Sequence, residues 1–540
     1  MLTSASPTPS AHVDTFTRDH LPPVSDWPDL IFDLPELQYP QQLNCATALL
    51  DTTVAAYGRE RPCVHTTHST WTYGTMLDRA NQIAHVLTKN YGLVPGNRVL
   101  LRAPNTPWLV AAWFAVVKAG GVVVTTMPLL RAVELRKLLD LTRPTLAICD
   151  DRLLDELHAA DPDLPVATLG GADDLAARAA AEPVEFADVA TAANDVVLLA
   201  PTSGTTGNPK ATMHFHRDVL ANADTFSRAL LRPTPDDVFT GTPPLAFTFG
   251  LGGLVVFPFR VGASTVLLEE ADPRNLVEAI DRFQVTILFT APTAYRILLK
   301  RDDLTRLRSL RRCVSAGEHL PEPVFAEFMQ RTGLKIINGI GGTELLHIFI
   351  SAADDDIRPG ATGRTVPGYI AEIQDEQGRA LPDGTPGQLA VKGPTGCRYL
   401  GDPRQREFVR NGWNLTGDTY TRDADGYFWY HARNDDMIVS AGYNIGSPEV
   451  EAVLDQHPDV VESGVIGIAD PDRGMIVHAA VVLRPGVSGD EAKIRELQAF
   501  AKATAAPYKY PRSIEFLDRL PRNSSGKLQR FKIRERWLSK

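Results

Sequence analysis

A short segment rich in hydroxyl groups and glycine is the strongest candidate for chemistry in this sequence. Glycines let backbone N–H groups converge on an anion, hydroxyls donate further hydrogen bonds, and a lysine supplies positive charge. The segment therefore predicts a loop that binds phosphate, and composition alone leaves a flexible hairpin turn as the alternative. Its candidate ligands are Thr202, Ser203, Gly204, Thr205, Thr206, Gly207 and Lys210.

The spacing in this segment differs from that of a Walker A loop. Only Asn208 and Pro209 separate Gly207 from Lys210, and the residues after the lysine alternate between polar and apolar, as in a strand. A Walker loop instead opens a helix. The spacing therefore argues against a P-loop nucleotide hydrolase.

A second glycine-rich segment, residues 336–344, ends in Thr343 and Glu344. A hydroxyl beside a carboxylate can hold a phosphate and its magnesium ion. Taken alone, the segment is more typical of a glycine turn with a solvated glutamate.

Three more polar residues stand near turns in the last quarter of the chain. Asp418 could accept hydrogen bonds from two ribose hydroxyls, and Arg433 could donate to the same sugar or to a phosphate. Lys527 lies on a loop of serine and glycine. Each of them, taken alone, is more typical of an ordinary surface turn.

Composition removes several classes of protein. The chain has 540 residues, of which 44% are hydrophobic and 22% charged, as in globular proteins of several domains. Its net charge of −10 argues against bulk nucleic-acid binding and against a basic membrane surface. The five cysteines are scattered without a C-x-x-C pair, which predicts reduced core residues. The first twenty residues have neither a basic start nor an apolar stretch, so we expect no signal peptide. The apolar segments elsewhere are too short to span a bilayer, and we expect a cytoplasmic enzyme.

Patterns typical of helices alternate with short β-branched runs over most of the chain. Helices are expected at 78–88, 108–119 and 276–283, and strands at 98–103, 120–128, 144–150, 285–292 and 310–318. This alternation predicts an α/β fold of packed βαβ subdomains with mostly parallel sheets. From about residue 361, strands separated by glycine-rich turns predict a small antiparallel β-barrel or meander. We expect an N-terminal domain at 1–434, with an extended arm at 1–40, and an α+β C-terminal domain at 435–540.

The order of these motifs resembles that of a known superfamily. The phrases TSGTTGNPK, GIGGTE, LTGD, ARNDDMIVSAGYNIGSPEVE and PRNSSGKLQR closely resemble the successive core motifs of the adenylate-forming acyl-CoA synthetases. The phrases PPLAFTFGLGG and GIGGTELLHIFIS look most like aryl-CoA ligases of the benzoate and 2-aminobenzoate type. Two positions depart from the family pattern: Ala211 stands where many relatives have glycine, and Asp435 where lysine is frequent.

The resemblance implies a reaction in two steps. A carboxylate attacks the α-phosphate of MgATP to give an acyl-adenylate and pyrophosphate, and the thiol of coenzyme A then displaces AMP. The implied partners are an aromatic carboxylic acid, ATP, Mg²⁺ and coenzyme A, with no nucleic acid and no membrane. A homodimer is one arrangement that the sequence leaves open.

The resemblance also implies roles for the matching positions. The loop with Lys210 would bind the β- and γ-phosphates, Thr343 the α-phosphate, Glu344 Mg²⁺, Asp418 and Arg433 the ribose, and Lys527 the reacting oxygens. Adenine would lie between the turn of Ala316, Gly317 and Glu318 and the backbone of Asn338, Gly339 and Ile340. After rotation of a mobile C-terminal domain about a hinge at Asp435, coenzyme A would pass Ser440, Ala441, Gly442, Tyr443 and Asn444.

The acid pocket is likewise carried over from the family pattern. Its wall would comprise Ala246, Phe247, Thr248, Phe249, Gly250, Gly341, Gly342, His347 and Ile348. An aromatic side chain with glycines makes a flat apolar slot for a ring. Thr248 or His347 could bond an amino or hydroxyl substituent, and a satisfied core histidine is the alternative for His347.

Two other functions compete with a CoA ligase. The first is a stand-alone adenylating enzyme that loads an aryl acid onto a carrier protein. Thirteen residues follow Lys527, so we expect no fused carrier domain. The second is a nucleotide-binding regulatory protein with an inactive site, which the presence of Lys210, Glu344 and Lys527 disfavours.

Overall fold

The computed structural model describes residues 9–202, 209–433, 436–440, 443–470, 474–505, 509–522 and 526–539. Two compact units are present: Met1–Ala371 with Val391–Asn414, and Glu372–Ala390 with Leu415–Lys540. Residues 434 and 435 lie outside the described residues, so the predicted domain boundary and the hinge at Asp435 stay predictions.

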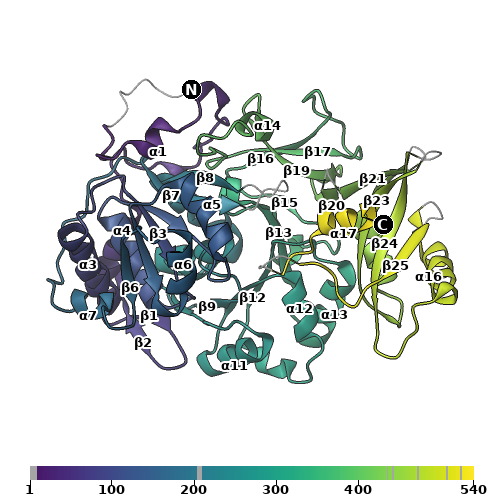
Figure 1. Cartoon of the computed structure of the whole chain (residues 1–540), viewed down its shortest axis with the longest axis horizontal. Coiled ribbons are helices and arrows are strands. Elements are labelled where there is room, and N and C mark those ends of the chain that lie inside the picture. The colour runs from purple at the N-terminus through teal and green to yellow at the C-terminus, as the bar shows by residue number, and fades with distance from the viewer. Residues whose placement is uncertain are drawn as a thin grey trace. The chain divides into compact units, whose positions relative to one another are not determined.

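The first unit contains a six-stranded sheet in the order β6-β5-β3-β4-β7-β8 (Figure 1). Its strands are β3 (Arg98–Arg102), β4 (Val122–Thr125), β5 (Leu146–Asp150), β6 (Val166–Leu169), β7 (Val196–Thr202) and β8 (Lys210–Phe215). All neighbours are parallel except β7 and β8. Helices α5 (Ala132–Thr142) and α6 (Leu154–Ala160) pack on one face around Leu100, Val124 and Leu138. Helices α3 (Tyr73–Asn90) and α4 (Pro107–Lys118) lie together on the other side (Figure 1).

A nine-stranded sheet in the same unit has the order β15-β14-β13-β12-β11-β9-β10-β1-β2. Its strands are β1 (Pro62–His65), β2 (Thr70–Thr72), β9 (Val238–Gly241), β10 (Ser264–Val266), β11 (Ile287–Thr290), β12 (Arg312–Ser315), β13 (Ile336–Gly341), β14 (Ile348–Ser351) and β15 (Arg364–Thr365). Helices α11 (Pro273–Phe283), α12 (Pro292–Leu298) and α13 (Glu322–Thr332) share a core with it that includes Leu288 and Phe328. The βαβ organisation expected from the sequence is confirmed.

Shorter elements of the first unit connect the sheets. They are α1 (Phe16–Asp19), η1 (Val24–Asp26), η2 (Pro35–Leu37), η3 (Thr47–Asp51), α2 (Thr52–Tyr57), η4 (Asp151–Leu153), α7 (Leu175–Ala179), α8 (His216–Asn222), η5 (Ala223–Leu231), α9 (Thr248–Leu251), η6 (Gly252–Val256), α10 (Phe257–Val261), η7 (Leu304–Leu307), η8 (Thr343–Leu345), η9 (Asp354–Asp356) and α14 (Gln405–Phe408). Residues 9–40 form only short helical turns, and Asp14 there pairs with Arg98 at 2.5 Å.

A five-stranded sheet corresponds to the expected antiparallel meander. Its order is β16-β17-β19-β18, with β20 pairing β19, for β16 (Ile370–Gln374), β17 (Gly387–Lys392), β18 (Val409–Arg410), β19 (Trp413–Arg422) and β20 (Phe428–Arg433).

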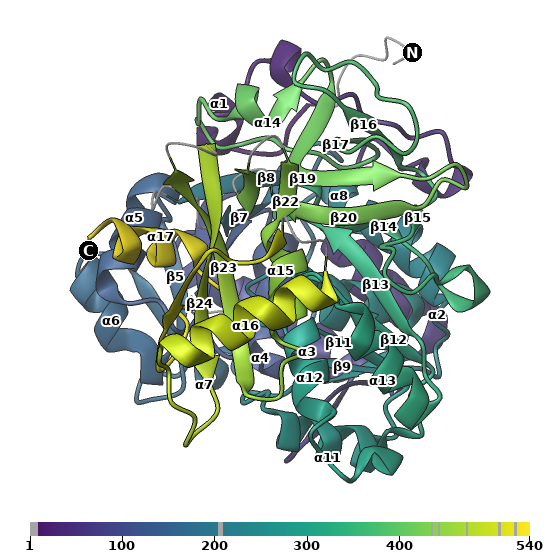
Figure 2. The same ribbon diagram turned by 90° about the vertical axis from the view of Figure 1, so that its right-hand side faces the viewer.

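The end of the second unit is an α+β layer structure. A sheet of β21 (Met437–Ser440), β22 (Tyr443–Gly446), β23 (Val460–Asp470), β24 (Gly474–Leu483) and β25 (Ser513–Phe516) carries α15 (Ser447–Leu454) and α16 (Glu491–Thr504) on one face (Figure 2). Helix α17 (Arg530–Leu538) packs on the other face through Ile533.

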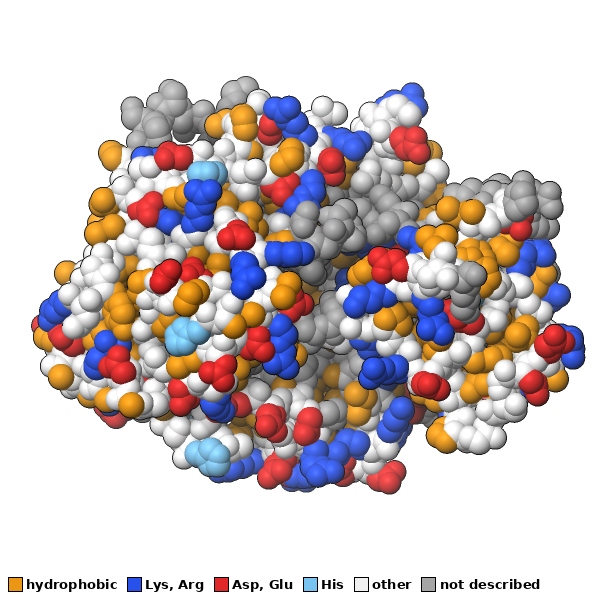
Figure 3. Space-filling model, in the orientation of Figure 1, with side chains coloured by type: hydrophobic (Ala, Val, Ile, Leu, Met, Phe, Trp, Pro, Cys, Tyr) orange, Lys and Arg blue, Asp and Glu red, His pale blue; other side chains and the backbone are white. Residues whose placement is uncertain are grey.

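The structure bears on the predictions made from cysteine content, charge and apolar segments. All five cysteines are buried and free, so their predicted place in the core is confirmed, and burial raises the pKa of the Cys313 thiol to about 12. On the face shown in Figure 3, basic side chains lie among acidic ones. Within the described residues, no helix is both long and apolar enough to cross a bilayer.

Candidate functional site

The predicted phosphate loop connects two antiparallel strands. Strand β7 ends at Thr202, which pairs with Lys210 at the start of β8. The loop residues Ser203, Gly204, Thr205, Thr206 and Gly207 lie outside the described residues. The Thr202 hydroxyl is buried without a hydrogen-bond partner among the described residues. The strand predicted after the lysine is confirmed.

Strand β8 presents three polar side chains on one face. Lys210, Thr212 and His214 alternate with apolar residues, and side chains two apart in a strand share a face. Residues 398–400 run beside β8, because Met213 N–H donates to the Arg398 carbonyl at 2.7 Å and Leu400 N–H donates to the Ala211 carbonyl at 2.9 Å. Tyr399 therefore lies opposite Thr212.

Tyr399 links the predicted lysine to the predicted glutamate. Lys210 Nζ donates to Tyr399 Oη at 2.7 Å, and Tyr399 Oη donates to Glu344 Oε1 at 2.6 Å. Lys210 Nζ itself stands 4.0 Å from Glu344 Oε1. Burial, followed by the negative charge of Glu344, raises the pKa of Tyr399 well above its ordinary value, so its hydroxyl stays a donor. The two charged side chains that the sequence predicted are thus held together.

His214 fixes the turn that carries Thr343 and Glu344. Its Nε2 lies 2.8 Å from the Thr343 carbonyl, and since a carbonyl only accepts, Nε2 must carry the proton. Burial, with a further contribution from the charge of Arg398, lowers the pKa of His214 to about 3. The imidazole is therefore neutral and acts as a fixed donor to the turn.

A buried ion pair anchors the segment that carries Tyr399. Arg398 and Asp218 are both fully buried and pair with each other. The Arg398 guanidinium also stacks 4.0 Å from the centroid of the Phe215 ring. Removing one partner of such a pair is strongly destabilising, because the other charge stays buried. This pair fixes Arg398 to helix α8, which directly follows β8.

The segments predicted to hold adenine lie side by side. Strands β12 and β13 are parallel, with Ser315 opposite Asn338. The turn Ala316–Glu318 follows β12 directly and so lies next to Asn338, Gly339 and Ile340. Gly317 has φ +87°, and a Cβ atom there would meet open space. The arrangement leaves room beside this turn, and the adenine role stays a prediction.

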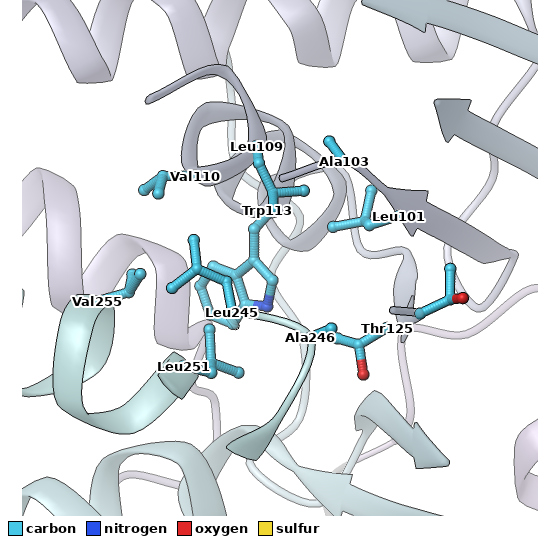
Figure 4. A pocket seen from close by; sticks show the side chains of 11 residues that line it. Leu101, Ala103, Leu109, Val110, Trp113, Thr125, Leu245, Ala246, Leu251 and Val255 are labelled. Atoms are coloured by element: carbon cyan, nitrogen blue, oxygen red, sulfur yellow. The ribbon is translucent and has the colours of Figure 1, made fainter. Parts of the chain in front are cut away.

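Two small cavities divide the predicted acid wall. The first, here called the Trp113 cavity, has a volume of about 20 Å³ that water-sized groups can occupy. It is lined by Leu101, Ala103, Leu109, Val110, Trp113, Thr125, Thr126, Leu245, Ala246, Leu251 and Val255 (Figure 4). The second, here called the Thr248 cavity, offers about 10 Å³ and is lined by Val219, Asn222, Thr248, Leu251, Gly252, Val256 and Leu346. Ala246 thus faces one cavity, Thr248 the other, and Leu251 both. The remaining predicted wall residues are not among these linings: Phe247, Phe249, Gly250, Gly341, Gly342, His347 and Ile348.

His347 stands in a cluster of phenylalanine rings beside the Thr248 cavity. Its ring centroid lies 4.6–6.1 Å from those of Phe226, Phe249, Phe257 and Phe289. The backbone of Phe249 contributes a hydrogen bond to the ring, and both alternatives for His347, a contact to the acid and a satisfied core histidine, stay predictions. Burial lowers the pKa of His347 to about 3, so the ring is neutral.

Buried neutral histidines make folding sensitive to acid. His214, His216 and His347 each have a pKa lowered to about 3 by burial, against about 6.5 in an unfolded chain. Between these values the unfolded state binds more protons, so stability falls as pH falls, by about 1.4 kcal/mol per pH unit for each histidine. We expect His347→Phe to flatten the loss of thermal stability between pH 6.5 and 4.5. The same change at exposed His68 should leave the slope as in the wild type, and an equal slope in H347F would contradict this account.

The second unit holds the remaining predicted residues. Asp418 on β19 pairs in register with Arg433 on β20, and Arg433 Nη1 lies 3.5 Å from Asp418 Oδ1. Buried Ser440 ends β21 and pairs with Tyr443 of β22, which also contains Asn444. Ala441 and Gly442 lie outside the described residues.

Lys527 is exposed and lies between β25 and α17. Arg522 and Leu528 form a backbone bridge, and Arg522 Nη1 donates to the Gly526 carbonyl at 2.8 Å.

Comparison with known proteins identifies the family. The family model for AMP-binding enzyme matches residues 50–399, and that for the AMP-binding enzyme C-terminal domain matches residues 449–527. The chain belongs to the AMP-binding enzyme family. Within it, the chain is an acid–thiol ligase of the adenylate-forming acyl-CoA synthetase superfamily.

Several relatives of this ligase align over almost the whole chain. A benzoate–CoA ligase of Thauera aromatica is 34% identical, with 93% of this chain and 97% of the relative covered. An anthranilate CoA ligase solved in complex with anthranoyl-AMP is 33% identical with a TM-score of 0.87, covering 94% of this chain and 99% of the other. A benzoate CoA ligase from Burkholderia xenovorans LB400 is 31% identical with a TM-score of 0.83, covering 91% and 100%.

Sequence reasoning missed Tyr399, His214 and Asn222. Tyr399 and His214 contact partners that are distant in sequence, and Asn222 lines the Thr248 cavity, so local sequence patterns do not single these residues out. Only His214 could have been found from the sequence, because it is predicted to lie on the same strand face as Lys210.

Proposed function

We propose that this ligase activates an aromatic carboxylic acid with MgATP and transfers the aroyl group to the thiol of coenzyme A. The observation that carries the proposal is the hydrogen-bonded chain Lys210–Tyr399–Glu344, with Thr343 beside it. It puts a cation and a carboxylate at the end of the hairpin expected to hold phosphates. The named activities of the benzoate and anthranilate relatives support an aromatic acid.

The donor set at Glu344 fits magnesium. Mg²⁺ prefers oxygen ligands and usually binds through one or two carboxylates plus substrate phosphates. Tyr399 occupies Oε1 of Glu344, while Oε2 receives no hydrogen bond among the described residues. When bound, Mg²⁺ would neutralise phosphate charge. Glu344 would hold it, and Thr343 would bind the α-phosphate.

This chain's own residues then orient two displacements. Lys210, Thr202 and the intervening loop bind the β- and γ-phosphates, while Asp418 and Arg433 bind the ribose. Lys527 stabilises the charge that develops as the carboxylate attacks the α-phosphorus and pyrophosphate leaves. The thiol of coenzyme A then attacks the aryl-adenylate carbonyl and AMP leaves, with the backbone of Ser440–Asn444 lining the thiol's path.

An uncharged pocket favours an aromatic acid over an α-amino acid. The lining of the Thr248 cavity contains no charged side chain, so an ammonium group would lack a partner there. Asn222 Nδ2 donates to the carbonyls of Asp218 and Val219 at 3.2 and 2.7 Å. These bonds point Oδ1 the other way, and it is buried without a partner among the described residues.

Asn222 is therefore expected to favour a ring substituent that donates a hydrogen bond. A cavity of about 10 Å³ suits one heavy atom, which matches the amino group of 2-aminobenzoate. Asn222→Leu should raise the KM for 2-aminobenzoate about tenfold and leave that for benzoate within twofold. An equal change for both acids in steady-state assays would refute this role.

A panel of acids tests the proposed function. Benzoate, its amino and hydroxy isomers, cinnamate and medium-chain fatty acids are each added with MgATP, and pyrophosphate release is followed. The proposal expects the aryl acids to be preferred over the fatty acids, and a preference for fatty acids would overturn it. Release of free aryl-CoA without any carrier protein separates this function from carrier loading.

A further inference from the structure

The Trp113 cavity contains polar groups that nothing in the described structure satisfies. Trp113 Nε1 and the hydroxyls of Thr125 and Thr126 are buried without hydrogen-bond partners among the described residues. Trp113 is 3% exposed, Thr125 7% and Thr126 3%. Buried donors and acceptors left unpaired are costly and rare in native proteins. A hydrogen-bonding group bound in this cavity would satisfy them.

The rest of the lining defines what that group can be. The other residues that border the cavity are leucine, valine and alanine, and the lining contains no charged side chain. A carboxylate, phosphate or ammonium would therefore lose its hydration without a partner. The indole N–H only donates, so the group must accept a hydrogen bond. It must also be small, since about 20 Å³ is room for one or two heavy atoms.

The cavity lies at the carboxyl ends of two parallel strands. Thr125 and Thr126 stand at the carboxyl end of β4, and Leu101 and Ala103 at that of β3, which is the edge where open α/β sheets bind ligands. All its lining side chains are buried except half-buried Ala246. In Figure 4 the indole nitrogen is on the ring edge that faces Ala246.

The wall between the two cavities is short and fixed. Leu251 borders both cavities, and residues 245–251 supply Ala246 to one and Thr248 to the other. Asn105 holds this segment, because its Nδ2 donates to the Pro243 carbonyl at 3.1 Å and its Oδ1 accepts from Leu245 N–H at 2.8 Å. The two cavities are therefore neighbours that share Leu251.

We propose that the Trp113 cavity is a second subsite for the acid, which binds a small uncharged ring substituent that accepts a hydrogen bond from Trp113 Nε1. A methoxy group has this chemistry: two heavy atoms, an acceptor oxygen and an apolar methyl. The proposal rests on the proposed function and adds to it a preference, among substituted benzoates, for those with such a substituent.

Matched acids and two variants test the subsite. The probes are 2-, 3- and 4-methoxybenzoate, each compared with the ethylbenzoate of equal shape that lacks the acceptor. For at least one position, wild type should prefer the methoxy acid about fivefold in kcat/KM. Trp113→Phe keeps a ring but removes the N–H, so this preference should vanish. Ala103→Val narrows the cavity and should lower kcat/KM for both acids at that position. Benzoate should stay within twofold in both variants.

The outcomes separate this inference from the proposed function. If benzoate is turned over but neither variant changes the discrimination among substituted acids, the cavity holds water at most and the subsite is overturned. If no aryl acid supports pyrophosphate release in the wild type, the proposed function fails and the subsite fails with it.

Discussion

Replacing Lys527 by alanine is expected to slow aryl-adenylate formation about 10²- to 10³-fold and to leave thioester formation from pre-made aryl-adenylate at the wild-type rate. The proposed ammonium contact stabilises charge that develops only in the first step, and losing one such donor typically costs this much. Pyrophosphate release reports the first step, and aryl-CoA formation from synthetic aryl-adenylate reports the second.

A matched control is available on the neighbouring helix. Lys532 is an exposed lysine of α17, and Lys532→Ala removes the same charge five positions away, so both steps should stay near wild type. Equal loss of the two steps in K527A would show that Lys527 does not act in adenylation alone.

Replacing Glu344 by glutamine is expected to lower adenylation about 10²-fold and to raise the Mg²⁺ concentration needed for half-maximal binding of ATP. Glutamine keeps the size and can still accept from Tyr399, but it lacks the charge that a divalent cation requires. Titrating Mg²⁺ into the enzyme with ATP, followed by calorimetry, gives a readout that does not depend on turnover.

Tyr399→Phe should lower the rate of adenylation about tenfold, less than E344Q does. It should also raise the Mg²⁺ concentration needed for half-maximal binding of ATP. The hydroxyl bonds a charged carboxylate and is itself bonded by Lys210, and such bonds are stronger than neutral ones. Glu322→Gln, on the first turn of α13, is the control carboxylate and should change neither quantity. A normal Mg²⁺ titration in E344Q would contradict the metal assignment.

The elements that carry the phosphate loop could be predicted because their signals are local. Alternation after Lys210 indicated a strand rather than the helix of a Walker loop, and β8 is that strand. The strand before Ala316 was also predicted, and its parallel pairing with β13 places the two segments side by side.

The partners of the charged residues could not be predicted, because they depend on tertiary register. Tyr399 is 189 residues from Lys210 and reaches it only because residues 398–400 line up with β8. The acid wall stays a prediction, but the two cavities that its residues line could not be inferred from the sequence. Ala246 lies before helix α9 and Thr248 is the first residue of that helix, so the run predicted as one wall spans a change of backbone structure and lines two cavities.

The central claim is that this chain joins an aromatic acid to coenzyme A through an adenylate. The most direct test incubates the full chain with MgATP, coenzyme A and either benzoate or 2-aminobenzoate, and separates the products by chromatography with mass detection. The account predicts aryl-CoA and AMP in equal amounts, both absent when the acid is left out, and aryl-adenylate when coenzyme A is left out. Formation of ADP and phosphate, or no aryl-CoA from either acid, would contradict it.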